Sequence, residues 1–133
     1  MELISTHFVK TGDVGYHGNL FGGVMLAWLD EAAASFAAQV ADTPRMVTRH
    51  IAGLTFERPV RPGQIIKIYG EVGRVGKTSL TLNMEARRHS VYNGTQRPVV
   101  NTQMTFVRID GDGDAIPISE KVRQKYRDPK DFT

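Results

Sequence analysis

The chain has 133 residues, about the length of one domain, of which 41% are hydrophobic and 23% are charged. These ordinary globular values exclude a disordered chain, and a net charge of +3 gives no basic block that would indicate a nucleic-acid partner. The absence of cysteine excludes disulfides, a thiol nucleophile and cysteine-ligated zinc, and is consistent with a cytoplasmic protein.

Polar and apolar residues alternate loosely over residues 2–10 and predict a first strand, which a glycine-containing loop follows over 11–19. The most apolar stretch, residues 22–41, is rich in alanine and predicts one long helix. This stretch is near membrane-spanning length, but Asp30 and Glu31 lie at its centre, where each charge would cost roughly 2.5 to 3.5 kcal/mol in a bilayer. We therefore expect a buried helix of a globular protein and no membrane partner.

Four further strands are expected after the helix, because β-branched residues and alternating patterns recur there. Their ranges are residues 46–56, 64–75, 78–90 and 98–109. Gly76-Lys77 and Asn93-Gly94 predict tight connections between the last three strands. Residues 119–126 predict a short helix, which Asp128-Pro129 ends.

These elements predict a single α+β domain over residues 1–133, in which residues 119–133 form a short tail. A single apolar helix has to be covered on most of its circumference, which a flat sheet with one buried face cannot do. We therefore expect a curved antiparallel sheet of about five strands wrapped around one long central helix.

The start of the predicted helix carries Asn19 and the glycine pair Gly22-Gly23. The first N–H groups of a helix have no partner within it, and the positive end of the helix dipole lies there. Glycine lets a ligand approach these donors without a Cβ in the way, which suits a developing oxyanion. The alternative is structural: Asn19 caps the helix, and the glycines allow close packing.

Asp30 is a candidate general base, because a carboxylate in an apolar helix is costly to bury unless it is paired, hydrogen-bonded or used. Its position eight residues after Gly22 corresponds to about 12 Å along the helix axis. Asp30 therefore cannot act on a group bound at the start of its own helix. In a two-fold dimer with antiparallel helices, Asp30 of one copy would face Asn19 and Gly22 of the other.

The segments HGNLFGG (residues 17–23) and LDEA (residues 29–32) resemble the helix-start signature of hotdog-fold acyl-CoA thioesterases. The similarity is to the branch with the YciA-type and brain-type acyl-CoA hydrolases. FERPVRPGQ, at residues 56–64, resembles a second motif of that family. Phe21 differs from many relatives, which have His before the glycine pair.

This resemblance implies the hotdog fold and hydrolysis of a fatty or aryl acyl-CoA thioester. The amide of Gly22 or Gly23 would polarise the carbonyl, Asn19 would orient water or substrate, and Asp30 would serve as general base or nucleophile. Because coenzyme A is part of the substrate, no separate cofactor is expected. The expected assembly is a homodimer, which can extend to a tetramer or hexamer.

The turn Gly76-Lys77-Thr78-Ser79 resembles the family's coenzyme-proximal turn. It combines backbone N–H groups, two hydroxyls and one ammonium, which together suit the phosphates of coenzyme A. Arg87 is a further candidate for this coenzyme-binding role.

Three other possibilities involve different chemistry. The four histidines lack the spacing of a metal site, so no metal is expected. An enoyl-thioester hydratase would need an Asp-x-x-x-x-His pair, and Asp13 with His17 is one residue short of it. A non-catalytic protein that binds or senses acyl-CoA is the alternative of a different class; free-thiol release distinguishes it from an enzyme.

Overall fold

The structure is a computed structural model that describes residues 1–127. It begins with strand β1 (Glu2–Phe8) and a short 3₁₀ helix, η1 (Thr11–Asp13), which precede helix α1 (Gly22–Ala41). The bounds of α1 are those that the apolar stretch predicts. The predicted break at Asp128-Pro129 lies outside the described residues.

Four strands and one short helix follow α1. They are β2 (Met46–Ile51), β3 (Ile65–Val75), β4 (Ser79–His89), β5 (Gln96–Arg108) and α2 (Glu120–Lys125). Strand β2 ends five residues earlier than predicted, because its pairing with β5 stops at Ile51, opposite Met104. After Ile51, the N–H groups of Ala52 and Glu57 still donate to the β5 carbonyls of Gln103 and Val99.

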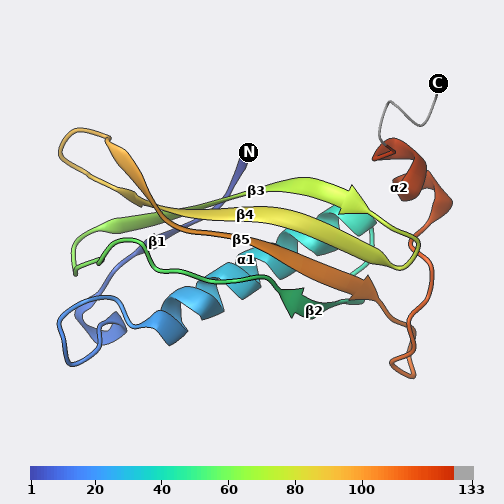
Figure 1. The fold of residues 1–133 in the computed structure, drawn as a ribbon, viewed down its shortest axis with the longest axis horizontal. Coiled ribbons are helices and arrows are strands. Elements are labelled where there is room, and N and C mark those ends of the chain that lie inside the picture. The colour runs from blue at the N-terminus through green and yellow to red at the C-terminus, as the bar shows by residue number, and fades with distance from the viewer. Residues whose placement is uncertain (128–133) are drawn as a thin grey trace.

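The five strands form one antiparallel sheet in the order β1-β3-β4-β5-β2. Helix α1 runs along one face of this sheet, and its start lies at the end where β1 leads into the first loop (Figure 1). This arrangement confirms the predicted α+β hotdog fold. Strands β1 and β2 are the edge strands, and α1 connects them across the sheet.

The core lies between α1 and the facing side of the sheet. Every second residue of β4 from Leu80 to Ala86 is buried, as the alternation predicts for a half-buried strand. Leu29 and Ala33 of α1 are fully buried, and each leucine buried in this way stabilises the fold by about 1.5 to 3 kcal/mol. The side of α1 away from the sheet stays exposed along Ala27, Glu31, Ser35 and Gln39.

The two ends of α1 differ in how their backbone groups are paired. At the C-terminal end, Asp42 adopts a left-handed conformation with φ 56°, and its N–H donates to the Ala38 carbonyl. The N–H of Thr43 donates to the same carbonyl. At the N-terminal end, Phe21 occupies the N-cap position, and no side chain caps the helix. Within residues 1–127, no helix is both long and apolar enough to cross a membrane.

Candidate active site

The start of α1 offers two free hydrogen-bond donors. The Phe21 carbonyl accepts from the N–H groups of Val24 and Met25, at 3.0 and 3.2 Å. The amides of Gly22 and Gly23 have no acceptor among residues 1–127. These are the first two residues of the helix, so their N–H groups also lie at the positive end of its dipole.

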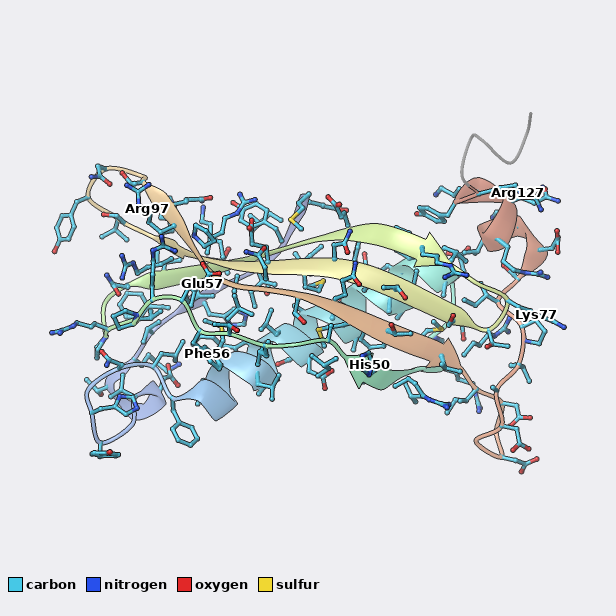
Figure 2. All side chains as sticks on the ribbon, in the orientation of Figure 1. His50, Phe56, Glu57, Lys77, Arg97 and Arg127 are labelled. Atoms are coloured by element: carbon cyan, nitrogen blue, oxygen red, sulfur yellow. The ribbon has the colours of Figure 1, made fainter. Side chains whose placement is uncertain are left out.

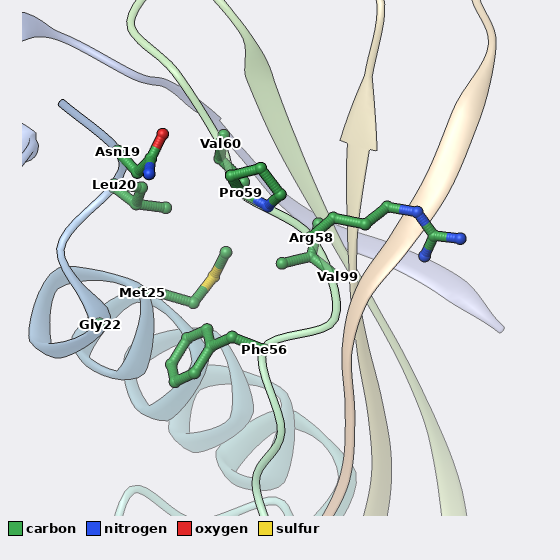
Figure 3. Close-up of a pocket in the computed structure, with 9 residues that line it drawn as sticks. All are labelled: Asn19, Leu20, Gly22, Met25, Phe56, Arg58, Pro59, Val60 and Val99. Atoms are coloured by element: carbon green, nitrogen blue, oxygen red, sulfur yellow. The ribbon is translucent and has the colours of Figure 1, made fainter. Parts of the chain in front are cut away.

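A cavity of about 250 Å³ adjoins this helix start (Figure 3). Its lining comes from the loop before α1, the first turn of α1, the segment after β2, and β5: Asn19, Leu20, Gly22, Met25, Phe56, Arg58, Pro59, Val60 and Val99. Two backbone bonds hold these parts together, from the Leu20 N–H to the Val60 carbonyl and from the Glu57 N–H to the Val99 carbonyl. Most of the lining is apolar, so the cavity suits an apolar group beside the free donors.

Asn19 lies in this cavity lining rather than at the helix cap. The structural alternative for Asn19 is therefore wrong, because Phe21 is the N-cap residue. The backbone N–H of Asn19 donates to Nδ1 of His17 at 3.1 Å. Within residues 1–127 its side-chain amide has no hydrogen-bond partner, so it is available to a ligand.

Asp30 lies outside the cavity lining, two helical turns further along α1. Its carboxylate is half-buried, and its Oδ1 accepts a hydrogen bond of 2.7 Å from the Thr48 hydroxyl on β2. The neighbouring Glu31 is exposed. Within one chain the structure therefore does not bring Asp30 together with Asn19 and the glycine pair.

Strand β2, which carries the Asp30 partner Thr48, is an edge strand with one unpaired side. It pairs with β5 alone among residues 1–127, and the side chains of Val47 and His50 on it are exposed. An edge strand presents a row of N–H and C=O groups that can pair with another strand. The edge closest to Asp30 is thus open to a second chain.

The turn between β3 and β4 lies at the far end of the molecule from Phe56 (Figure 2). The Gly76 N–H donates to the Ser79 carbonyl at 2.7 Å, so this expected phosphate donor is already used. A Cβ on residue 76 would lie 2.8 Å from the Ser79 Oγ, so a larger residue there would have to shift the Ser79 side chain. The exposed Lys77 ammonium and the hydroxyls of Thr78 and Ser79 are further groups in this turn that suit a phosphate.

Arg87 lies well away from this turn. It is eight residues after Ser79 on β4, which corresponds to about 26 Å along a strand. Its guanidinium pairs with Glu85 and lies 4.0 Å from the centre of the Tyr69 ring. The structure therefore does not bring Arg87 and the turn together within one chain.

The Asp13 and His17 pair considered for a hydratase does not form. Asp13 accepts a 2.9 Å hydrogen bond from the Lys10 N–H and forms an ion pair with the Lys10 ammonium. His17 is exposed, with its Nδ1 facing the Asn19 N–H. Within residues 1–127, no three His, Asp or Glu side chains gather as a metal site would require.

Comparison with known proteins shows the family. Residues 17–95, more than half of the chain, match the thioesterase superfamily. The chain belongs to this superfamily. Among its relatives, the acyl-CoA thioester hydrolase YciA of Salmonella typhimurium is 28% identical over 120 residues, which are 88% of this chain and 90% of that protein.

Solved thioesterase structures share the fold. A hexameric hotdog-fold thioesterase of Campylobacter jejuni is 29% identical, with a TM-score of 0.85 over 95% of this chain and 96% of that chain. A hexameric thioesterase from Yersinia pestis is 26% identical, with a TM-score of 0.82 over 90% of this chain and 96% of that chain. These likenesses confirm the family and fold that the helix-start motif predicts.

Several cavity residues of this thioesterase were not expected from the sequence as site residues. Leu20, Met25 and Val99 were not singled out at all, and the sequence noted Phe56, Arg58, Pro59 and Val60 only as part of a family motif. All of these residues except Arg58 are apolar and look like ordinary core residues in the sequence. These residues line one cavity only because α1, β5 and the segment after β2 are in contact in the folded chain.

His7 is a further residue with an unusual environment. Its ring stacks on Trp28 of α1, with 4.5 Å between ring centres, and its Nε2 lies 3.0 Å from the Ser5 Oγ. Burial lowers the pKa of His7, and the nearby Glu31 carboxylate opposes this effect.

Proposed function

We propose that this thioesterase hydrolyses acyl-CoA to a free acid and coenzyme A. The observation that carries the proposal is the apolar cavity beside two free N–H donors at the start of α1. Family membership and the acyl-CoA thioester hydrolases among the relatives support the same reaction. Coenzyme A enters as part of the substrate, so the reaction needs no separate cofactor.

In this mechanism the acyl chain occupies the cavity, and the thioester carbonyl oxygen faces Gly22 and Gly23. Asp30 takes a proton from a water molecule, which attacks the carbonyl carbon. Negative charge then develops on the carbonyl oxygen, where the free N–H groups and the helix dipole stabilise it. The C–S bond breaks, the coenzyme thiolate leaves, and Asp30 returns the proton. Asn19 orients the water or the carbonyl.

This mechanism needs two chains at each site. Asp30 and Gly22 are eight residues apart in one helix, about 12 Å along its axis. Pairing of two β2 edges about a two-fold axis would run the two α1 helices antiparallel and bring Asp30 of one copy to the helix start of the other. We therefore propose a homodimer as the smallest active unit; the hexameric relatives support further assembly.

The same two-fold arrangement gives the β3–β4 turn a role. Lys77 of this turn lies toward the opposite end of the molecule from Phe56, which lines the cavity (Figure 2). In the proposed dimer the turn of one copy therefore approaches the cavity of the other. We propose that Lys77, Thr78 and Ser79, shaped by Gly76, bind the coenzyme phosphates. Arg87 pairs with Glu85 within its own chain, so we do not include it in this proposal.

Free-thiol release from a panel of acetyl, hexanoyl, palmitoyl, phenylacetyl and hydroxybenzoyl thioesters of coenzyme A tests the activity. Asp30→Asn should lower kcat by roughly 10²- to 10⁴-fold, because it removes the proton acceptor. Glu31→Gln is the matched control and should keep wild-type turnover, because Glu31 is exposed. Tight binding of acyl-CoA without thiol release would favour the non-catalytic alternative.

A mixed oligomer tests whether the site is shared between chains. Asp30→Asn and Asn19→Ala chains are each expected to have little activity alone. When they are co-expressed and purified with different tags, a mixed dimer keeps one site with both groups intact and should regain activity. No regain would place both groups in the same chain's site.

A further inference from the structure

The β3–β4 turn is held in place by backbone hydrogen bonds from outside it. The Lys77 carbonyl accepts from the Ile118 N–H at 2.8 Å, and the Thr78 carbonyl accepts from the Arg108 N–H at 3.0 Å. Arg108 is the last residue of β5, but Ile118 comes later in the chain and belongs to no strand or helix. A segment that follows the sheet therefore fixes the backbone of the residue that carries the ammonium of the turn.

This segment, the arm (residues 116–125), consists of a short stretch after β5 and helix α2. Ile118 and Val122 are only 1% and 2% exposed, and both belong to the hydrophobic core. The Ile116 N–H also donates to the Arg108 carbonyl at 2.9 Å. Figure 1 shows α2 at the same end of the molecule as the connection between β3 and β4. The arm is thus anchored in the core beside the turn that it contacts.

Two arginine side chains bind the backbone of the arm where it meets the turn. Nη1 of Arg108 donates to the Pro117 carbonyl at 3.0 Å, and Nε of Arg123 donates to the Ile118 carbonyl at 3.0 Å. Arg123 also forms an ion pair with Glu120 at 2.7 Å. Hydrogen bonds from a charged donor are roughly twice as strong as neutral ones. Guanidinium groups therefore hold the peptide groups on both sides of Ile118, while the Ile118 N–H holds the turn.

The contacts of the arm all lie within one chain, so they do not depend on how a second chain completes the site. Burial of Ile118 and Val122 explains how the arm is anchored. The polar contacts at residues 117 and 118 do more, because they converge next to the Lys77 carbonyl. A binding loop that is ordered before its ligand arrives binds more tightly, since the ligand does not have to order it. The arrangement therefore keeps the turn ordered for a ligand.

We infer that the arm holds the β3–β4 turn in the conformation that binds the coenzyme phosphates, and that Arg108 and Arg123 are its positioning residues. This inference rests on the coenzyme-binding role that we propose for the turn. Neither arginine contacts the coenzyme; both act on Lys77 through the backbone of residues 117 and 118. When one of them is removed, the Lys77 ammonium is still present, but part of the binding free energy is lost in ordering the turn.

Steady-state kinetics with two substrates test the inference. Hexanoyl-CoA carries the nucleotide, and the hexanoyl thioester of N-acetylcysteamine lacks it. Arg123→Met removes the donor to the Ile118 carbonyl at a side chain that is 32% exposed. It should raise KM for hexanoyl-CoA about two- to tenfold, the range for one hydrogen bond. The kcat should not change, because the reacting groups are untouched, and KM for the N-acetylcysteamine thioester should not change either.

The matched control is Lys121→Met, which also removes one positive charge from α2. Lys121 is exposed, and its side chain makes no hydrogen bond or ion pair within residues 1–127. Its KM for hexanoyl-CoA should therefore stay at the wild-type value. An equal rise in KM for Arg123→Met and Lys121→Met would show that only the total charge matters, and would overturn the inference. Arg108→Met tests the second contact and decides the matter if Arg123→Met does not fold.

A double-mutant cycle with Lys77→Ala separates positioning from direct contact. If Arg123 acts through Lys77, the rise in KM caused by Arg123→Met should largely disappear in the Lys77→Ala chain. If the two rises in KM multiply instead, Arg123 acts independently of Lys77 and the inference fails.

Titration calorimetry with free coenzyme A distinguishes this inference from the proposed function. The wild type may bind coenzyme A without releasing thiol from any acyl-CoA, in which case the proposed hydrolysis fails. The inference then still stands if Arg123→Met weakens coenzyme A binding about two- to tenfold and Lys121→Met does not. If thiol is released, but neither Arg108→Met nor Arg123→Met changes KM or the affinity for coenzyme A, the inference fails and the proposed hydrolysis stands.

Discussion

The two ends of helix α1 differ in what they do with their unpaired backbone groups. At the C-terminal end, the N–H groups of Asp42 and Thr43 both donate to the Ala38 carbonyl. At the N-terminal end, Phe21 gives no side-chain cap, and the N–H groups of Gly22 and Gly23 have no partner among residues 1–127. One helix thus has a fully paired end and an end with two free donors, and only the free donors are available for the reaction that we propose.

Replacing Gly22 by proline tests most directly whether the free N–H groups at the N-terminal end of α1 are needed for activity. Proline removes the N–H but is well accepted at the first position of a helix. Phe21, with φ −68° and ψ 132°, already has the extended conformation that a residue before proline requires. If the Gly22 amide stabilises the oxyanion, Gly22→Pro should lower kcat by about 10²- to 10³-fold with little loss of stability.

The matched control is Gly22→Ala, which keeps the N–H. Its new Cβ would lie 3.5 Å from the Phe56 ring, an ordinary contact, so the helix start should be undisturbed. Its kcat should stay within a few-fold of the wild type. Full activity of the proline variant would show that Gly23 alone supplies the donor.

A charge reversal at Lys77 tests whether the β3–β4 turn, at the other end of the molecule, binds the coenzyme phosphates. If the dimer brings this turn to the open helix end of the partner, Lys77→Glu should raise KM for acyl-CoA about two- to tenfold, as expected for an exposed charge contact. The effect should shrink at high salt, because such contacts are screened over about 10 Å at 0.1 M. The kcat should not change. Equal loss with short thioesters that lack the nucleotide would remove the turn from the coenzyme site.

Substitutions at the C-terminal end of α1 should change the free energy of unfolding and leave kcat unchanged. Asp42 adopts a left-handed backbone conformation, which is unfavourable for a residue with a Cβ. It also places a negative charge at the negative end of the helix dipole. Asp42→Gly should therefore raise the free energy of unfolding by about 1 kcal/mol. Asp42→Asn keeps the side-chain shape and isolates the charge contribution. Both can be measured by urea denaturation, and a change in kcat for either variant would contradict the division between the two ends.

The smallest expected effect is a change in the pH dependence of stability. It concerns His7, which packs on Trp28 in the N-terminal half of α1. Burial lowers the pKa of His7 in the folded chain, so the unfolded chain binds the proton first as the pH falls below about 6.5. The stability that neutral His7 contributes is present above that pH and is lost as the pH falls through the folded pKa. His7→Phe keeps a ring against Trp28 and should lose less stability than the wild type between pH 7.5 and 5. Equal losses in thermal denaturation would rule out this contribution.

The sequence predicted the fold and family well, because their signals are local. The bounds of α1 follow from its apolar run, and the alternation in β4 shows which residues face the core. The end of β2 could not be predicted in the same way. One more β-branched residue, Thr55, follows Ile51 in the predicted range, but pairing with β5 decides where the strand stops.

The candidate site was predictable only where its residues are adjacent in the chain. From the sequence, Asn19 could have been the N-cap residue of α1. The backbone conformation of Phe21 shows that Phe21 is the N-cap residue instead. Arg87 is a candidate for coenzyme binding because it is basic, yet the length of β4 separates it from the β3–β4 turn within one chain. The roles of Asp30 and of the turn remain predictions, since they depend on a second chain.

The strand order described above has a consequence for how the chain folds. Strands β3, β4 and β5 are consecutive and form neighbouring hairpins, so they can pair after closing only short loops. Strands β1 and β2 must join opposite edges through partners more than fifty residues away, and non-local pairing of this kind is slow. We expect the central hairpins to form first, and the helix with its two flanking strands to dock onto them as one unit. The first turn of α1 and the segment after β2, which both line the cavity, then come together only when α1 docks, so a partly folded chain does not form the cavity.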